Sequence, residues 1–491
     1  MDVIIPLDRD APSSLANQIY SGLRSAIISN RIPGGARLPS TRDLARQLGV
    51  ARFTIDDAYA RLAAEEYVVG RRGAGTYVIE HPQLANQHIV VDRPAREPRR
   101  KPSAWSQRVL ATPEATEVEV SSEPFVSFGT GRPTLEEFPW TVWQRLLNRE
   151  AREQPRDAYA YSDPAGLEDL RETISQYLTR SRGLDCAPDE VVVTSGFQQS
   201  LDVVARMFVN PGDHVLIEDP CYPRVRRMLS AAGARVNPMP VDGDGLLVDQ
   251  LPGGDQPAKL LYTTPSHQYP TGAILSLQRR MDLLAWADET GAVIVEDDYD
   301  GELRYDARPV PPLAGLARER NAANNVVYTG SFSKVLFPAL RLGYAVLPRD
   351  LVTPYLRAKE TIDRHAPTLL QATVTAMIRE GYFERHLARM RRLYASRQTA
   401  LVEAIERHLA GIAFRDVETT SAGLHLLVRM AVSMSERELL QRAADHGIQM
   451  DGANHCFATA PPQPHLLLGF AAVPEDRISA GIERLARALR A

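Results

Sequence analysis

Lysine is scarce in this sequence, and one lysine stands where it could act as a nucleophile. Of the 57 basic residues, the lysines are Lys101, Lys259, Lys334 and Lys359. Lys334 ends the segment Ser331-Phe332-Ser333-Lys334, just past an apolar stretch. A lone lysine there is most often a surface residue, but a desolvated lysine can form a Schiff base with a carbonyl cofactor such as pyridoxal phosphate. Ser331, Ser333 and Arg341 could then hold the dianionic phosphate.

Two other apolar stretches end in residues that suit the same cofactor. Asp297 and Tyr299 follow the stretch AVIVE. A carboxylate such as Asp297 would keep the pyridine nitrogen protonated and the ring electron-withdrawing, and Tyr299 could donate to the phenolic oxygen. Ser195, Gly196 and Phe197 lie where a strand passes into a helix, and the first amide N–H groups of a helix favour phosphate.

Tyr222 and Arg224 extend this candidate site. Both lie in EDPCYPRVR, after a further apolar stretch. The ring of Tyr222 could stack on the cofactor, and the guanidinium of Arg224 could bind a ligand carboxylate. Taken singly, each residue could be structural, but their occurrence together in this order favours a cofactor site.

These residues need a scaffold that gathers the ends of several strands. From Leu170 onward, helical stretches alternate with short apolar runs bounded by Gly, Pro or Asp: VVVTSG, DHVLIED, KLLYTTPS, AVIVEDDYD, NNVVYTGSFSK and LGYAVLP. This alternation predicts an α/β fold with a mostly parallel sheet, whose ligand sites lie at the carboxyl ends of the strands.

Residues 1–80 carry a different pattern. Apolar residues at four-residue spacing predict a helix over 13–29, Ser40 or Thr41 can cap a short helix, and Gly49 supplies a turn before a helix over 52–65. Residues 67–78 suggest two strands around a glycine-bearing turn. This order predicts a winged helix-turn-helix that binds DNA in the major groove. The alternative is a helical oligomerisation domain with solvated arginines.

Residues 81–122 separate that pattern from the α/β region at 123–491. They contain prolines at 82, 94, 98, 102 and 113 and a basic cluster, which predicts an extended, semi-stiff linker. The basic cluster is either a solvated segment or an auxiliary phosphate contact.

Composition excludes several classes of protein. The 491 residues are 44% hydrophobic and 24% charged with a formal net charge of −4, so disorder throughout is excluded. The sequence shows neither a membrane-span pattern nor a signal peptide. Three cysteines without CxxC spacing argue against a disulfide scaffold or a thiolate metal site. We expect a cytoplasmic protein without a metal, associated with the nucleoid when it binds DNA.

The segment LPSTRDLARQLGVARFTIDDAYARLAAEEYVVGRRGAGTYV resembles the GntR family of bacterial repressors. The resemblance implies that double-stranded operator DNA contacts the helix-turn-helix and the wing, through Ser40, Thr41, Arg42, Arg52, Thr54, Arg71, Arg72 and Gly73. The sequence departs from the family at Ala51, where serine is usual, and at Glu66, where glycine is usual. One hydroxyl donor to phosphate is thus missing, and the turn at the wing could differ.

The ordered set SGFQQ, EDPCY, TPSHQYPTG, EDDYD and SFSK resembles fold-type I aminotransferases, and with the GntR-like head the chain resembles the MocR subfamily of regulators. The resemblance implies a large domain with a mostly parallel sheet, a smaller C-terminal α+β subdomain, and a Schiff base on Lys334. It also implies a head-to-tail, domain-swapped homodimer in which the partner's Tyr161 completes each site.

Two positions depart from the aminotransferase pattern. Tyr269 precedes Pro-Thr-Gly where those enzymes have an asparagine, and we expect Tyr269, with Arg224, to contact an effector. Leu467 stands where they place the arginine for the substrate carboxylate. Either Arg224 alone holds a carboxylate, or the effector is not an α-amino acid, and we favour the second.

These features are compatible with three functions to different degrees. The favoured one is a transcription factor that senses pyridoxal phosphate or an amine or amino-acid effector, with residual half-transamination allowed. An active aminotransferase with a fused DNA-binding head is weakened by the missing arginine. A cofactor-free dimerisation scaffold is opposed by the intact set of Lys334, Asp297, Tyr299 and Arg341.

Overall fold

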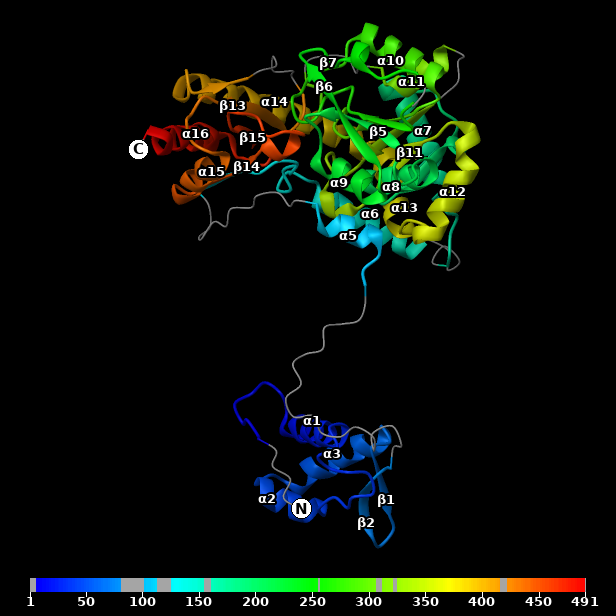
Figure 1. The fold of residues 1–491 in the computed structure, drawn as a ribbon, viewed down its shortest axis with the longest axis vertical. Coiled ribbons are helices and arrows are strands. Elements are labelled where there is room, and N and C mark those ends of the chain that lie inside the picture. Colours follow the sequence, from blue (N-terminus) through cyan, green and yellow to red (C-terminus); the bar gives the residue numbers. More distant parts are fainter. Residues whose placement is uncertain are drawn as a thin grey trace. The chain divides into compact units, whose positions relative to one another are not determined.

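The computed structural model describes residues 6–80, 101–112, 125–153, 160–254, 257–305, 311–320, 325–415 and 422–490. The chain divides into two compact units, Met1–Lys101 and Pro102–Ala491, and each is described by itself (Figure 1). The predicted domain boundaries at 81 and 122, and the basic cluster apart from Lys101, lie outside the described residues.

The smaller unit packs helices against one another beside a β-hairpin. Its elements are α1 (Leu15–Ile28), α2 (Thr41–Leu48), α3 (Arg52–Ala64), β1 (Val68–Arg71) and β2 (Gly75–Val78). β1 and β2 pair antiparallel. The core consists of fully buried side chains from the helices, including Ile19, Leu23, Leu44, Ile55 and Leu62. The predicted winged helix-turn-helix is confirmed.

Local backbone chemistry sets the helix ends of this unit. The Ser40 side chain accepts from the Asp43 amide at 3.1 Å and so caps α2. Gly49 ends α2 with a left-handed φ of 64°, which glycine adopts at little cost. Ala51 provides no side-chain cap for α3. Glu66 has a φ of 60°, a left-handed conformation that glycine adopts at less cost than glutamate.

The larger unit is built on an eight-stranded sheet in the order β4-β11-β10-β9-β8-β5-β6-β7. β5, β6, β8, β9 and β10 run parallel where they pair, whereas β11 is antiparallel to both of its neighbours and β7 to β6. The strands are β4 (Val191–Thr194), β5 (His214–Asp219), β6 (Arg235–Asp242), β7 (Gly245–Leu246), β8 (Leu260–Thr263), β9 (Val293–Asp298), β10 (Val326–Ser331) and β11 (Gly343–Val346). Each predicted apolar run forms a strand of this sheet, so the predicted fold class is confirmed.

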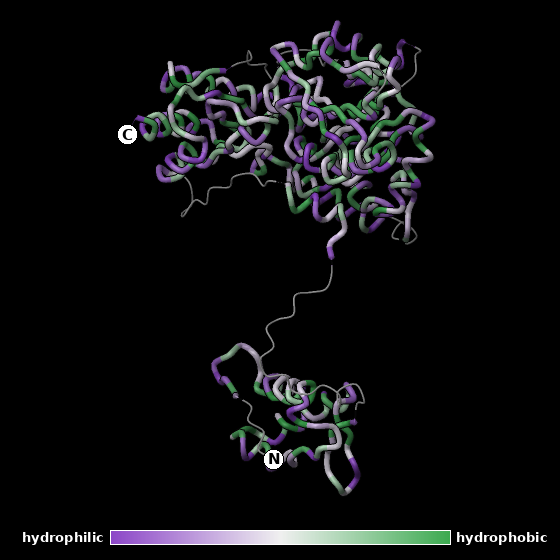
Figure 2. Tube along the Cα trace, viewed as in Figure 1, coloured by the Kyte–Doolittle hydropathy of each residue, from purple (hydrophilic) through white to green (hydrophobic). Residues whose placement is uncertain are grey.

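Helices cover both faces of the sheet because its central strands are apolar on both sides. Val192 packs with buried residues of α8 (Phe197–Phe208), α9 (Pro223–Ala232) and α12 (Arg349–Asp363). Val191 and Val193 belong to the core on the opposite face, which includes α7 (Glu168–Arg182), α10 (Leu277–Thr290), α11 (Leu313–Glu319) and α13 (Thr368–Arg379). Figure 2 shows the hydrophobic stretches gathered inside this unit.

A second sheet forms the smaller C-terminal subdomain of the same unit. Its strand order is β12 (Ala413–Phe414), β13 (His425–Met430), β15 (His465–Gly469), β14 (Ile448–Gly452) and β3 (Val126–Phe128). β3 comes from before the large sheet in the sequence and pairs parallel with β14. The subdomain also contains α14 (Tyr382–His408), α15 (Glu436–Asp445) and α16 (Glu475–Arg490), and α6 (Trp140–Glu153) packs against α13.

The segment predicted as an extended linker contains a helix, α5 (Ala104–Leu110). Ser103 caps it by accepting from the Ser106 amide at 3.2 Å. Arg108 Nε donates to the Ala231 carbonyl at the end of α9, 2.9 Å away. The expectation of an extended chain throughout 81–122 is therefore corrected: at least these residues fold onto the larger unit.

Among the described residues, no helix is long and apolar enough to span a bilayer. That part of the chain likewise holds no group of three or more His, Cys, Asp or Glu arranged to bind a metal ion.

Candidate functional site

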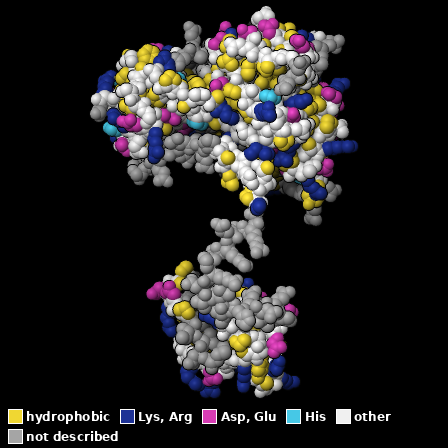
Figure 3. Space-filling view, viewed as in Figure 1, with side chains coloured by type: hydrophobic (Ala, Val, Ile, Leu, Met, Phe, Trp, Pro, Cys, Tyr) yellow, Lys and Arg dark blue, Asp and Glu magenta, His cyan; other side chains and the backbone are white. Residues whose placement is uncertain are grey.

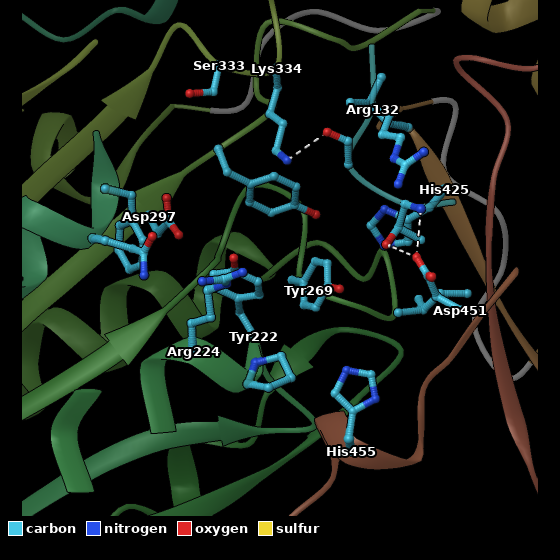
Figure 4. A pocket seen from close by; sticks show the side chains of 18 of the residues that line it. Arg132, Tyr222, Arg224, Tyr269, Asp297, Ser333, Lys334, His425, Asp451 and His455 are labelled. Carbon is cyan, nitrogen blue, oxygen red and sulfur yellow. Dashed lines mark hydrogen bonds between the residues drawn. The ribbon is translucent and has the colours of Figure 1, made fainter. Parts of the chain in front are cut away.

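A cavity of about 1050 Å³ opens beside the ends of the central strands, with the second sheet forming its other wall (Figure 4). The predicted site residues that line it are Gly196, Phe197, Tyr222, Arg224, Tyr269, Asp297, Tyr299, Ser331, Ser333, Lys334 and Arg341. They come from the last residues of β9 and β10 and from segments that follow β4, β5, β8, β9 and β10. The parallel arrangement of these strands thus gathers residues that are far apart in the sequence.

Two predicted residues lie elsewhere. Ser195 is outside the cavity lining, and its amide N–H donates to Gln199 Oε1 at 2.8 Å, which fixes the start of α8. Tyr161 is 80% exposed, and the Arg364 guanidinium lies 4.1 Å from its ring centroid. Neither residue therefore contributes to the lining of the cavity in its own chain.

Lys334 points into the cavity from the segment after β10 (Figure 4). Its amine donates to the Gly131 carbonyl at 3.0 Å. Burial lowers the pKa of Lys334, Asp300 and Asp297 oppose that shift, and Arg224 adds to it. The net lowering enlarges the fraction of neutral amine, the form that attacks carbonyl groups.

Asp297 is a buried carboxyl at the end of β9. It accepts a hydrogen bond of 3.0 Å from the Tyr262 hydroxyl. The pKa of Asp297 is raised to about 8, chiefly by burial; Tyr262 and Lys334 oppose the rise, and Asp298 and Asp300 contribute to it. A cationic group close to this buried carboxyl would stabilise its charged form.

Tyr299 belongs to a hydrogen-bonded group that sequence reasoning missed. His267 Nδ1 lies 2.9 Å from the Tyr299 hydroxyl and 2.9 Å from Asp300 Oδ2. His425 packs nearby, and burial lowers the pKa of His425 to about 4. His267 lies in the motif SHQ, so the motif was visible, but its contact with Tyr299 depends on tertiary packing.

The start of α8 and the loop after β10 form a second polar end of the cavity. Gly196, with a φ of 109°, precedes α8 without a side-chain cap. Glycine permits this positive φ, and the Arg341 guanidinium lies 3.7 Å from the place that a Cβ of Gly196 would take. The Ser333 amide donates to Ser331 Oγ at 3.1 Å and folds the loop. Helix amides, hydroxyls and a guanidinium suit an anion.

The wall formed by the second sheet carries residues for which the sequence had suggested no role: Thr130, Gly131, Arg132, Asp451 and His455. Leu467 also lines the cavity and is 1% exposed. Asp451 on β14 pairs across the strands with Leu467 on β15. Only the pairing of β14 with β15 and β3 brings these residues to the site, and that pairing has no local sequence signal.

In the smaller unit, the predicted DNA-contacting residues gather around α2, the start of α3 and the hairpin. Arg42, Arg52, Arg71, Arg72 and Gly73 are exposed, while Thr41 and Thr54 are half-buried. Arg52 Nε donates to Thr41 Oγ1 at 3.3 Å and lies 3.6 Å from Asp56 Oδ2. Figure 3 shows Lys and Arg side chains gathered at the end of this unit that carries α2 and the hairpin.

Comparisons with known proteins assign both units to families. Residues 123–485 match the family of aminotransferases class I and II, and residues 15–78 match the bacterial regulatory proteins of the gntR family. The probable rhizopine catabolism regulatory protein MocR of Rhizobium meliloti is 36% identical over 489 residues, with 99% of this chain and 96% of that protein covered.

Two further relatives represent a regulator and an enzyme. The HTH-type pyridoxine biosynthesis transcriptional regulator PdxR of Corynebacterium glutamicum is 28% identical over 480 residues, with 97% of this chain and 96% of that protein covered. The crystal structure of LysN, an α-aminoadipate aminotransferase of Thermus thermophilus complexed with N-(5'-phosphopyridoxyl)-L-leucine, has a TM-score of 0.70 and 30% identity, with 79% of this chain and 98% of LysN covered.

A winged helix-turn-helix joined to an aminotransferase-like domain defines a class of DNA-binding transcriptional regulators. The chain belongs to the MocR subfamily of GntR-family regulators, because its similarity to MocR extends over both units.

The aminotransferase fold implies pyridoxal phosphate, and the cavity residues fit this cofactor. Lys334 supplies a buried amine with a lowered pKa. Asp297 is a buried carboxyl suited to a protonated ring nitrogen. The space beside Gly196 is bordered by Arg341 and suits a phosphate. The donors and acceptors thus match the cofactor's reactive and charged groups.

Proposed function

We propose that this chain is a transcription factor whose affinity for operator DNA depends on pyridoxal phosphate held at Lys334, or on an amine effector that reacts there. The observation that carries the proposal is the convergence of Lys334, Asp297, Tyr299 and Arg341 on one cavity, in a chain that also has a DNA-binding head. When bound, pyridoxal phosphate supplies a carbonyl that condenses with amines and a ring that withdraws electrons.

The side chains of the cavity have distinct roles in this proposal. Lys334 provides the amine, and Asp297 holds the proton on the ring nitrogen. Ser331, Ser333, Arg341 and the first amides of α8 bind the phosphate, and Tyr222 stacks on the ring. Tyr299 donates to the phenolic oxygen while His267, 2.9 Å from its hydroxyl, orients it. Arg224 and Tyr269 contact the effector.

The DNA-binding head reads its operator through α3 and the wing. Arg52, at the first turn of α3, contacts a phosphate at the edge of the major groove, and Arg71 and Arg72 at the hairpin contact further phosphates; the exposure of all three side chains supports these roles. Ser40, Thr41, Arg42, Thr54 and Gly73 complete the proposed contact surface.

The proposal includes a head-to-tail, domain-swapped homodimer. Tyr161 is 80% exposed and outside the cavity lining of its own chain, which supports a role in the partner's site. Effector binding would then shift the dimer between two arrangements of its heads. The size of this shift is limited by the difference in effector affinity between the two arrangements.

An active aminotransferase with a fused DNA-binding head is the second candidate. The similarity to LysN over 98% of that enzyme favours it. Leu467 opposes it, because a leucine cannot replace the charge-assisted bonds that an arginine would make with a substrate carboxylate. We therefore place regulation first, with any residual half-transamination as a side reaction.

The decisive experiment measures binding of the full-length protein to the DNA upstream of its own gene, at fixed salt, with and without pyridoxal phosphate. Lys334→Ala is the control. A cofactor-dependent change in affinity or footprint in the wild type, absent in Lys334→Ala, would support the switch and make pyridoxal phosphate the leading effector. Equal binding in all cases would leave an amine as the effector to be sought. No binding at all would favour the enzyme.

The same variant tests the assignment of Lys334. The wild type should acquire visible absorbance when pyridoxal phosphate becomes attached to the lysine, and Lys334→Ala should not. Retention of the colour in the variant would show that another residue holds the cofactor.

A further inference from the structure

One position on the wall formed by the second sheet differs from what an amino-acid site would require. Leu467 stands where an arginine would bind a carboxylate, and the residue that pairs with it across the strands is Asp451. Both line the cavity. A carboxylate that approached Leu467 would find no guanidinium at that position and would meet the carboxylate of Asp451 beside it.

Asp451 keeps one oxygen available on the cavity side. Its Oδ2 accepts from the Thr130 amide at 2.8 Å and from Thr130 Oγ1 at 2.7 Å. Oδ1 has no hydrogen-bond partner among the described residues, although Asp451 lines the cavity. The other acidic residue on this wall, Glu436, already accepts from the Asn454 amide at 2.7 Å. Asp451 is thus a positioned acceptor that a ligand can use.

The loop after β3 fixes how far this acceptor lies from the reactive lysine. Thr130 donates to Asp451, and the carbonyl of the next residue, Gly131, accepts from Lys334 at 3.0 Å. Adjacent α-carbons lie about 3.8 Å apart. An amine that reacts at Lys334 therefore needs only a short carbon skeleton to place a polar group beside Asp451.

The same wall also carries donors. Arg132 belongs to this loop and lines the cavity, and no ion pair or hydrogen bond of its side chain is found in the described part of the chain. His455 lines the same wall (Figure 4). An anion would be attracted by Arg132 but repelled by Asp451, and a second ammonium group would be attracted by Asp451 but repelled by Arg132, so either charged group meets a like charge here. A hydroxyl both accepts and donates, so it can satisfy both side chains.

We propose that the effector is a small amine whose far end carries hydroxyl groups in place of a carboxylate, and that Asp451 accepts a hydrogen bond from one of them. This inference rests on the proposed function, because the amine is recognised through the cofactor on Lys334. Asp451 and Leu467 together set the specificity against amino acids.

Serinol and serine are a matched pair of probes, because they differ only in a hydroxymethyl group in place of the carboxylate. Each is titrated into the full-length protein loaded with pyridoxal phosphate, and the change in visible absorbance gives the dissociation constant. We expect serinol to bind the wild type at least about tenfold more tightly than serine. Diaminopropane, which carries a second ammonium group, should also bind more weakly than serinol.

Asp451→Asn tests the residue. The asparagine oxygen can still accept from Thr130, so the loop stays in place, while the group facing the cavity changes from an acceptor to a donor. We expect the preference for serinol over serine to fall about tenfold or to reverse. Asp445→Asn is the matched control, because Asp445 is exposed on α15 in the same subdomain and is not among the cavity-lining residues. This variant should keep the wild-type preference.

The outcomes separate the two proposals. Equal or tighter binding of serine than serinol by the wild type, or an unchanged preference in Asp451→Asn, would overturn the hydroxyl-amine inference alone. Diaminopropane binding as tightly as serinol would also overturn it. If the wild type shows no visible absorbance of a lysine-bound cofactor, the proposed function fails and the inference fails with it.

Discussion

Asp297 shows how burial ties the chemistry of the site to the stability of the protein. Its pKa lies at about 8 in the folded chain, against 3.8 for an ordinary aspartate. Between these values the folded state binds a proton that the unfolded state has released. Stability contributed by this group therefore falls as pH rises from about 4 to about 8. A cationic group beside Asp297 would stabilise the charged carboxylate and so oppose this loss of stability.

Asp297→Asn should consequently stabilise the cofactor-free protein. An asparagine carries no charge to bury, so the gain over the wild type should grow with pH, by up to roughly 1.4 kcal/mol per pH unit in that window. Chemical unfolding of the cofactor-free protein between pH 5 and 8 measures it. The same variant should bind pyridoxal phosphate about tenfold or more weakly, since a charge-assisted bond is lost. If the gain in stability does not change with pH, then the pKa of Asp297 is not raised in the folded protein.

The cavity residues differ in how far sequence could predict them. Lys334, Asp297 and Tyr222 follow apolar strands of a parallel sheet, and the position after such a strand already implies a place at the sheet's ligand edge. Asp451, His455 and Arg132 come from a mixed sheet whose strands pair out of sequence order. Their position depends on β3 crossing to β14, and no local pattern encodes that pairing. Ser195 lies outside the cavity lining in this chain, and its amide donates to Gln199 at the start of α8.

Helix α2 directly follows Ser40, a residue that we propose contacts DNA and that also has a structural role. Ser40 caps the helix, so Ser40→Ala should destabilise the head by about 1 kcal/mol and weaken DNA binding as well. Ser40→Asp keeps an oxygen that can cap α2 but loses the hydrogen bond of 2.6 Å that Ser40 Oγ donates to Asp43 Oδ2, and it should weaken DNA binding because it places a negative charge near phosphate. Hydrogen exchange of α2 amides and DNA affinity in the full-length protein distinguish the two effects. Unchanged DNA affinity in Ser40→Asp would remove Ser40 from the interface.

Helix α3 carries the arginine on which the DNA proposal depends most. Arg52→Ala should lower DNA affinity and reduce the slope of log K against log salt by about 1, the contribution of one phosphate contact. Arg52→Lys should keep the slope, because the charge remains. The visible absorbance of the cofactor should be the same in both variants and in the wild type. An unchanged slope in Arg52→Ala would place Arg52 away from the phosphates.

The architecture of the chain was predictable because each unit repeats a strong local pattern. Alternating apolar strands and helices specify the parallel sheet, and capped short helices before a hairpin specify the head. The helix α5 was missed because its seven residues lie among prolines, and its docking depends on the contact of Arg108 with Ala231. Tertiary contacts of this kind override local composition.

The composite site predicted for the dimer can be tested by mixing variants. Lys334→Ala lacks the lysine in every site, and Tyr161→Ala should retain the cofactor poorly because every site lacks the partner's tyrosine. In a mixed dimer, one site carries both substitutions and the other carries neither. Free exchange of subunits should therefore restore about a quarter of the sites, measured as cofactor retained after gel filtration.

The matched control mixes Lys334→Ala with Asp297→Asn. Lys334 and Asp297 line the same cavity of one chain, so each protomer of that mixed dimer still lacks a residue of its own site and no recovery is expected. Recovery with Tyr161→Ala but not with Asp297→Asn would establish that Tyr161 acts across the dimer. Without recovery in either mixture, the exposed ring beside Arg364 would have to serve its own chain, and a head-to-tail exchange of site residues would be excluded.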